Sequence, residues 1–129
     1  MPDPDSQRSR ADLVHRLVVS TLPVIVLVQA ALAGQHLFEG AGITLHGILG
    51  NVTFALTVVG VVLAAVRRSD GPTFFVAVAL LALAFAQVGL GYVGRETSQA
   101  AAWHVPTGVA IFGLACYQLA DLRGARPGR

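Results

Sequence analysis

The chain has 129 residues, of which 54% are hydrophobic and only 12% are charged. Soluble domains carry about twice that share of charged residues, so the composition indicates a protein surrounded by lipid rather than water. The formal net charge of +2 is too small to indicate nucleic-acid binding. The single cysteine, Cys116, excludes an internal disulfide and a cysteine-based metal site.

Four long uncharged stretches follow one another along the chain. They contain about 22, 27, 24 and 24 residues between successive charged residues. Roughly 20 apolar residues are enough to cross a bilayer as a helix. Because lipid offers no hydrogen bonds to the backbone, we expect each stretch to be helical. The predicted helices cover residues 17–34, 43–66, 74–93 and 100–122.

Short connections containing helix-breaking residues join the predicted helices. Gly40 and Gly42 lie in the first connection, Gly71-Pro72 in the second and Gly94 in the third. Short connections make successive helices antiparallel neighbours. The predicted fold is therefore all-α: an integral membrane protein with an up-down bundle of four transmembrane helices.

The arginines divide unevenly between the two ends of this bundle. Only Arg95 falls on one side. The other side receives eight: Arg8, Arg10, Arg16, Arg67, Arg68, Arg123, Arg126 and Arg129. Basic residues in short loops stay in the cytoplasm, so both termini are predicted to be cytoplasmic, with the helices in a bacterial plasma (inner) membrane. We expect a membrane domain over residues 13–123, a disordered cytoplasmic tail over residues 1–12 and a cytoplasmic tail over residues 124–129.

The first predicted helix also has features of a cleaved signal peptide. It has an arginine-bearing start, an apolar stretch and Ala31-Leu32-Ala33, which resembles a cleavage site. Its apolar run is longer than such peptides usually have. We favour a membrane helix, because the internal repeat needs this segment as a partner for the third helix.

That repeat has an offset of 58 residues and the pattern Q-x2-L-x13-H-x3-G-x3-F. The matched pairs are Gln29/Gln87, Leu32/Leu90, His46/His104, Gly50/Gly108, Phe54/Phe112 and Leu56/Leu114. Gln and His are rare inside membrane helices, so their matches weigh more than those of Leu, Gly and Phe. The repeat predicts two helical hairpins that run in the same direction and are related by an axis along the membrane normal.

The repeat places His46 and His104 at equal depth, near the outer ends of the second and fourth helices. We expect their imidazoles to face each other across the axis. Helical spacing assigns an inward face to the second helix, with His46, Gly50, Thr53, Thr57, Gly60 and Ala64. The corresponding face of the fourth helix carries His104, Gly108, Ile111, Ala115 and Gln118. Small residues on the third helix that are expected to face inward are Ala82, Ala86 and Gly89.

Two opposed imidazoles can occupy both axial positions of a haem iron. With both positions filled, none remains for oxygen or a substrate. The hypothesis is therefore one haem b for electron transfer or haem handling, with a redox partner, rather than an enzyme. In this hypothesis Gly50 and Gly108, one turn from each histidine, leave room for a flat macrocycle. The alternative role of these glycines is close helix packing.

Three more residues are assigned to the haem site on their placement. Gln29 and Gln87 could hydrogen-bond the histidines or the haem edge, as outer-shell groups do. An ordinary interhelical hydrogen bond is the alternative for both. Arg95, the only arginine on the outer side, is the expected partner of a haem propionate, with a solvated loop charge as its alternative.

Other functions stay open at this point. An outer zinc site could use His46, His104, His36 and Glu39. A small transporter would need midplane polar groups, for which Thr53, Thr57 and Gln118 are available. A haem-free accessory or structural subunit of a larger membrane complex is the main alternative. His15 has no partner histidine on the inner side, so a second haem is not expected.

With His46 and His104 at the outer ends of the second and fourth helices, the two hairpins resemble one half of haem A synthase. They resemble the four-helix b-type cytochromes more distantly. Residues 35–54 and 103–114 are also similar to a family of small four-helix bacterial membrane proteins. The resemblance implies that the two histidines are axial haem ligands. It does not carry over the synthase reaction, because a complete synthase has two such halves and longer external loops.

Overall fold

The computed structural model describes residues 4–124, and throughout this range the chain is built from four helices. They are α1 (Pro4–Glu39), α2 (Thr44–Val66), α3 (Gly71–Val93) and α4 (Ser98–Gly124). Each is long and apolar enough to cross a membrane, by length and composition. The all-α prediction with four long apolar helices is confirmed for the described residues, and it indicates a multi-pass membrane protein.

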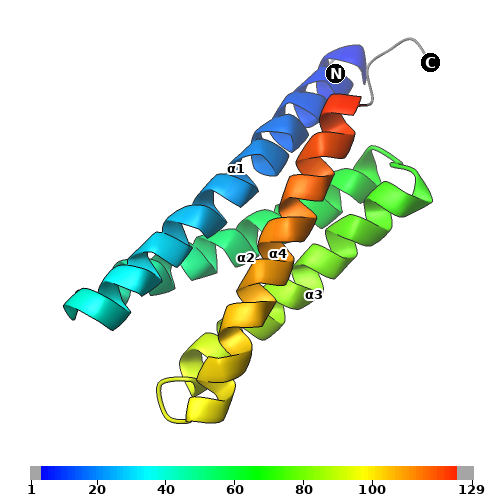
Figure 1. Cartoon of the computed structure of the whole chain (residues 1–129). Coiled ribbons are helices and arrows are strands. Elements are labelled where there is room, and N and C mark those ends of the chain that lie inside the picture. Colours follow the sequence, from blue (N-terminus) through cyan, green and yellow to red (C-terminus); the bar gives the residue numbers. More distant parts are fainter. Residues whose placement is uncertain (1–3, 125–129) are drawn as a thin grey trace.

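The helices form an up-down bundle in which α1 and α3 each pack against both α2 and α4 (Figure 1). The helices α2 and α4 therefore lie diagonally across the bundle from each other. The connection between α2 and α3 lies at the same end as the described start of α1 and end of α4. At the other end, the first hairpin (α1 and α2) and the second hairpin (α3 and α4) diverge, and we call this the open end.

The bounds of α2, α3 and α4 lie within three residues of the predicted ones. In contrast, α1 begins at Pro4 and ends at Glu39, so the segment predicted as a disordered tail over residues 1–12 is helical from residue 4 onward. No glycine or proline interrupts residues 5–22, and the Asp12 carboxylate pairs with the Arg67 guanidinium at 2.6 Å. Residues 1–3 and 125–129, with Arg126 and Arg129, lie outside the described residues.

Two local features explain where helices begin and end. The Asp70 carboxylate accepts a hydrogen bond of 3.0 Å from the backbone N–H of Thr73, and Pro72 lies in the first turn. Both features favour a helix start, so α3 begins at Gly71, three residues before the predicted position. After α1, Gly40 adopts a φ of +70°, a conformation that glycine accepts without the steric cost of a Cβ.

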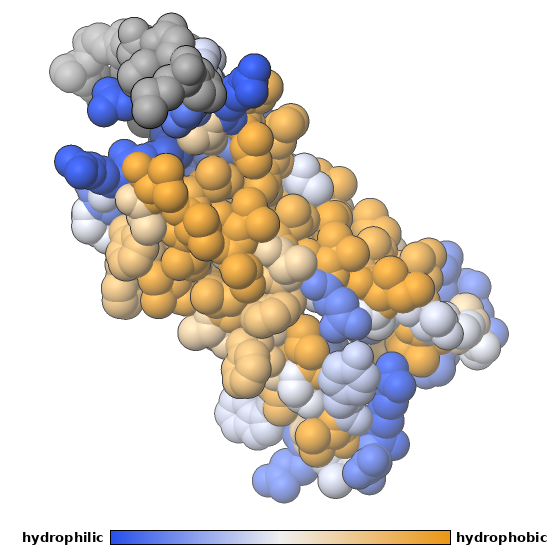
Figure 2. Space-filling model, turned by 180° about the vertical axis from the view of Figure 1, so that it is seen from behind, coloured by the Kyte–Doolittle hydropathy of each residue, from blue (hydrophilic) through white to orange (hydrophobic). Residues whose placement is uncertain are grey.

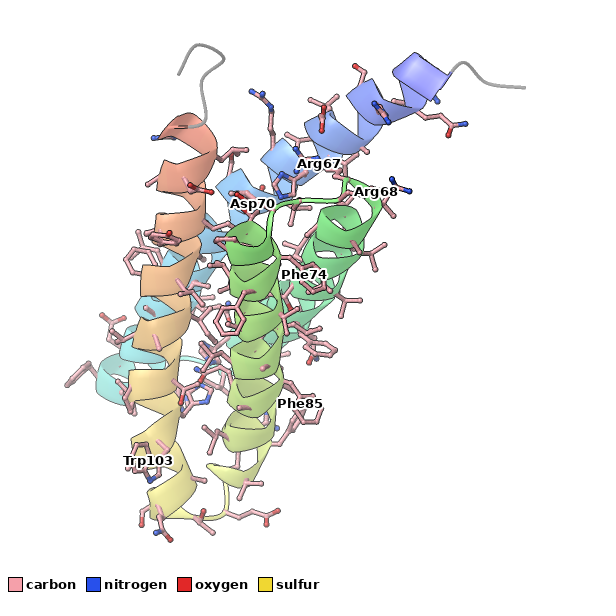
Figure 3. All side chains as sticks on the ribbon, turned by 90° about the vertical axis from the view of Figure 1, so that its right-hand side faces the viewer. Arg67, Arg68, Asp70, Phe74, Phe85 and Trp103 are labelled. Atoms are coloured by element: carbon pink, nitrogen blue, oxygen red, sulfur yellow. The ribbon has the colours of Figure 1, made fainter. Side chains whose placement is uncertain are left out.

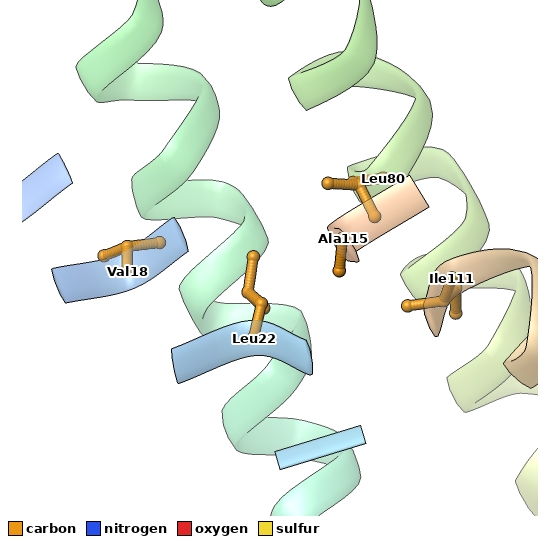
Figure 4. Close-up of a cluster of buried hydrophobic side chains, with 5 residues drawn as sticks. All are labelled: Val18, Leu22, Leu80, Ile111 and Ala115. Carbon is orange, nitrogen blue, oxygen red and sulfur yellow. The ribbon is translucent and has the colours of Figure 1, made fainter. Parts of the chain in front are cut away.

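A cluster of buried apolar side chains joins the two hairpins (Figure 4). It contains Val18 and Leu22 of α1, Leu80 of α3, and Ile111 and Ala115 of α4, none more than 6% exposed. In lipid, the tails solvate apolar side chains nearly as well as a protein core does, so such helices are held by close packing rather than by exclusion of water. Gly60 of α2 lies beside this cluster, since a Cβ at that position would be 3.9 Å from Val18 Cγ1.

The inward faces predicted for α2 and α4 are confirmed. The buried residues of α2 are Thr53, Thr57, Gly60 and Ala64. Those of α4 include Ile111, Ala115 and Gln118. The prediction for α3 is wrong: its buried residues are Ala77, Leu80 and Ala84, whereas Ala82, Ala86 and Gly89 are exposed. An apolar residue occupies nearly every side of α3, so its sequence carries no polar stripe to mark the outward face.

The outer surface of the bundle is apolar around its middle, and hydrophilic residues gather toward its ends (Figure 2). Phe75 and Phe85 of α3 are 72% and 70% exposed. Figure 3 shows Phe74 and Phe85 along α3 and Trp103 near the open end. Large apolar side chains are exposed on all four helices, which would be costly in water, and lipid removes that cost.

Candidate functional site

A cavity of about 660 Å³ lies at the open end of the bundle, and all four helices contribute to its wall. This volume falls within the roughly 300–1,000 Å³ that is typical of small-molecule sites. The structure brings all seven residues predicted for the site to this one wall: Gln29, His46, Gly50, Gln87, Arg95, His104 and Gly108. Most of the remaining wall is apolar, so the few polar groups are the ones that could orient a ligand.

The imidazoles of His46 and His104 meet across the bundle. Their ring centroids are 5.8 Å apart, and the ring planes are inclined by 57°. Both side chains are half-buried. A nitrogen ligand lies about 2 Å from its metal, so two imidazoles on opposite sides of one ion have centroids separated by roughly 6 Å. The observed separation matches this requirement, although the two helices are diagonal rather than adjacent.

A backbone carbonyl orients the His46 ring. The Nδ1 atom lies 3.0 Å from the carbonyl oxygen of Gln29. A carbonyl can only accept, so Nδ1 carries the proton and donates it, which leaves the lone pair on Nε2. Histidines that bind metals commonly have the second nitrogen held in this way. His46 is thus in the tautomer that offers Nε2 to a ligand.

The His104 ring is held differently. Its Nε2 atom lies 3.1 Å from the side-chain nitrogen of Gln87. An amide NH2 group can only donate, so Nε2 of His104 is the acceptor and the ring proton is on Nδ1. In the part of the chain that the structure describes, His104 Nδ1 and Gln87 Oε1 are buried without a hydrogen-bond partner. Both histidines therefore carry a lone pair on Nε2, but only that of His104 is engaged by a neighbour.

The two glycines next to the histidines lie against the glutamines. A Cβ on Gly50 would lie 3.4 Å from Gln29 Oε1, and one on Gly108 would lie 3.1 Å from Gln87 Nε2. Each glycine thus makes room for the glutamine of its own hairpin, while both also line the cavity. The amide of Gln29 donates to the Thr53 hydroxyl at 2.8 Å.

Gly91 contributes to the site and was missed by the sequence analysis. A Cβ at this position would lie 3.1 Å from His104 Cε1 and 3.5 Å from His104 Nδ1. The position 58 residues earlier is Ala33, so the repeat gave no sign of it. Thr53 was expected on the inner face but not as a partner of Gln29, because residues 24 apart on two helices meet only in the folded bundle.

Arg95 places a positive charge at the rim of the cavity. Its guanidinium carbon lies 5.4 Å from the centre of the Tyr92 ring. One of its terminal nitrogens would lie 3.7 Å from a Cβ on Gly47, across on α2. Arg95 itself is exposed. The site therefore has a cationic rim above two histidines and a largely apolar wall.

The structure does not assemble the zinc site considered from the sequence. Among the side chains that the structure describes, residues 6–124, no three of His, Cys, Asp or Glu lie close enough together to hold a metal ion. His36 does reach the cavity wall, but it is exposed and its Nδ1 lies 2.6 Å from the carbonyl oxygen of Ala41. His15 lies far along α1 from this site and is buried.

Comparison with models of known protein families, with curated proteins and with solved structures finds no match to this chain. The resemblance to haem A synthase rests on the arrangement of helices and histidines alone.

Proposed function

We propose that the protein is a bacterial inner-membrane protein that binds one haem b through His46 and His104, for electron transfer or haem handling. The observation that carries this proposal is the approach of the two imidazole rings to 5.8 Å at the wall of a cavity of about 660 Å³. A flat macrocycle would need a pair of facing ligands and a wide apolar wall, and the approach of the two rings and the mostly apolar lining of the cavity support this proposal.

The ligand chemistry of the site favours haem over a bare ion. Two neutral imidazoles are too few to satisfy a four-coordinate zinc ion, but His46 and His104 would be enough protein ligands to hold a haem iron. Haem would supply one-electron redox chemistry. The residues of the chain would bind and orient it: the Gln29 carbonyl holds the His46 ring, and the apolar wall excludes water.

Arg95 supports the proposal from the rim of the cavity. Haem carries two carboxylates, and a guanidinium suits a carboxylate because its N–H groups form paired hydrogen bonds. The exposed position of Arg95 would leave those carboxylates at the membrane surface while the macrocycle lies between the helices. No charged residue is then needed deeper in the cavity.

Contacts within the hairpins support the internal repeat. In each hairpin the histidine meets the glutamine that lies 17 residues earlier, His46 with Gln29 and His104 with Gln87. Each glutamine also faces the glycine of the same repeat unit. Two repeated hairpins related by an axis along the membrane normal would bring equivalent histidines to equal depth, as a shared iron requires.

The absorption spectrum of the purified protein tests the proposal. We expect the protein in detergent, supplied with haem, to show an oxidised and a reduced b-type spectrum. His46→Ala and His104→Ala should each abolish it. His36→Ala is the matched control, because this third histidine lines the same cavity without facing another ring, and the spectrum should remain. A wild-type protein that stays colourless with haem supplied would leave a haem-free accessory subunit of a membrane complex as the function.

A further inference from the structure

The two glutamines at matching repeat positions, Gln29 and Gln87, have different hydrogen-bond partners. In the first hairpin, the Gln29 amide donates to Thr53, and no described residue hydrogen-bonds Nε2 of His46. In the second hairpin, the Gln87 amide donates to Nε2 of His104. The nitrogen that an iron would use is therefore free on one histidine and occupied on the other.

A single difference between the repeat units explains this asymmetry. The residue that matches Thr53 at the offset of 58 is Ile111, which is 2% exposed. An isoleucine side chain has no oxygen to accept a hydrogen bond. The Gln87 amide consequently lacks the partner that its counterpart has, and the lone pair of His104 is the acceptor that it reaches instead.

We propose that Gln87 is a latch on His104: its amide must leave the Nε2 atom before that nitrogen can bind iron, whereas His46 is available at once. This inference rests on the proposed haem binding. Gln87 is a positioning residue here, because it acts through the histidine. The site would thus engage its cofactor in order, His46 first and His104 second.

The hydrogen bond from Gln87 to His104 is weakly stabilised, so it can be broken at little cost. While the latch is closed, Gln87 Oε1 and His104 Nδ1 are both buried without partners among the described residues. An unpaired buried polar atom offsets much of what a hydrogen bond contributes. Rotation of the Gln87 side chain away from the ring would release the lone pair without breaking any other hydrogen bond of this glutamine.

Haem titration of latch variants tests whether the Gln87 amide opposes haem binding at His104. Gln87→Leu removes the amide, and we expect haem affinity to rise about three- to tenfold, the range that corresponds to one ordinary hydrogen bond. Ile111→Thr should also raise affinity, because it offers Gln87 the partner that Gln29 has. Gln118→Leu is the control: it replaces another buried glutamine of the bundle that does not line the cavity, and affinity should not change.

A second measurement detects the hydrogen bond between Gln87 and His104 in the absence of haem. In the haem-free protein, ¹⁵N signals of the His104 ring should shift in Gln87→Leu, while those of His46 should stay in place. Unchanged His104 signals, or unchanged or lower haem affinity in both Gln87→Leu and Ile111→Thr, would overturn the latch while leaving haem binding intact. Should no variant bind haem although the His104 signals shift, the proposed function itself fails, and the ordered engagement fails with it.

Discussion

The His104 ring packs against Gly91 of the neighbouring helix α3, where the lack of a side chain leaves room for it. Gly91 of α3 lies so close that a Cβ there would approach His104 Cε1 to 3.1 Å, tighter than ordinary contacts. Gly91 lies in the last turn of α3 (Gly71–Val93), and a glycine inside a helix costs stability unless something needs the space. The imidazole is what occupies that space.

We predict that Gly91→Ala displaces the His104 ring and weakens haem binding severalfold. Gly89→Ala is the matched control, because nothing lies within 4 Å of a Cβ at that position of the same helix. Alanine should stabilise the helix by about 0.5–1 kcal/mol at Gly89 and by less at Gly91, where the ring must move. Unfolding measurements in detergent give the difference, and equal gains at both positions would contradict this prediction.

At the scale of single helices, α3 has the best-defined start. The Asp70 carboxylate accepts from the Thr73 backbone N–H at the N-terminus of the helix, where an anion is also favoured by the helix dipole. Interaction with the side chain of Thr73 first and with its backbone N–H second lowers the pKa of Asp70, although the Thr73 hydroxyl also lies 3.4 Å from the Asp121 carboxylate. Since the folded-state pKa lies below the unfolded value, the cap stabilises the protein above the usual Asp pKa of about 4. That stability is lost as pH falls through the folded-state pKa.

Thr73→Val tests this assignment. Valine keeps the shape of threonine and the backbone N–H but removes the hydroxyl, so the pKa of Asp70 should rise toward its ordinary value without reaching it. An NMR titration of the Asp70 carboxyl carbon measures the change. A pKa that stays the same would show that the hydroxyl has no part in the cap.

The length of α1 reflects the continuity of the helix more than its contacts with the rest of the bundle. Its first turns are polar and were expected to lie free of the bundle, yet they extend the helix to Pro4. Asp12 meets Arg67, which lies at the end of α2. Both side chains of this pair are partly exposed, and such pairs contribute little on their own, about 0–1 kcal/mol. Helical continuity therefore accounts for most of the order.

At the scale of the whole molecule, arginine placement predicts the orientation in the membrane. The start of α1 and the connection between α2 and α3 carry most of the described arginines and lie at one end of the bundle (Figure 1). In a Cys116→Ser background, Gln7→Cys should react with a membrane-impermeant thiol reagent only after the cells are permeabilised. Glu96→Cys, in the connection between α3 and α4, should react in intact cells. The reverse pattern would place the cavity on the cytoplasmic side.

Helix number and the approximate bounds of α2, α3 and α4 could be predicted from the sequence because an apolar run of about 20 residues is a local property. Inward faces could be predicted for α2 and α4, where polar and small residues recur at helical spacing. The same reasoning failed for α3, because Ala82, Ala86 and Gly89 differ too little from the residues around them. A uniformly apolar helix has no side that its sequence alone can assign to lipid.

From the sequence alone it follows that the chain is helical and that its helices are long and apolar enough to span a membrane. The sequence also predicts that His46 and His104 are equivalent members of a repeat. Packing of the bundle is what brings their rings to 5.8 Å from diagonal helices, leaves room for the His104 ring beside Gly91 and places the Gln87 amide on its Nε2 atom. The difference is one of sequence distance. The length of an apolar run is set by consecutive residues. Ring contacts and hydrogen-bond partners depend on side chains from different helices, and these meet only when the bundle packs.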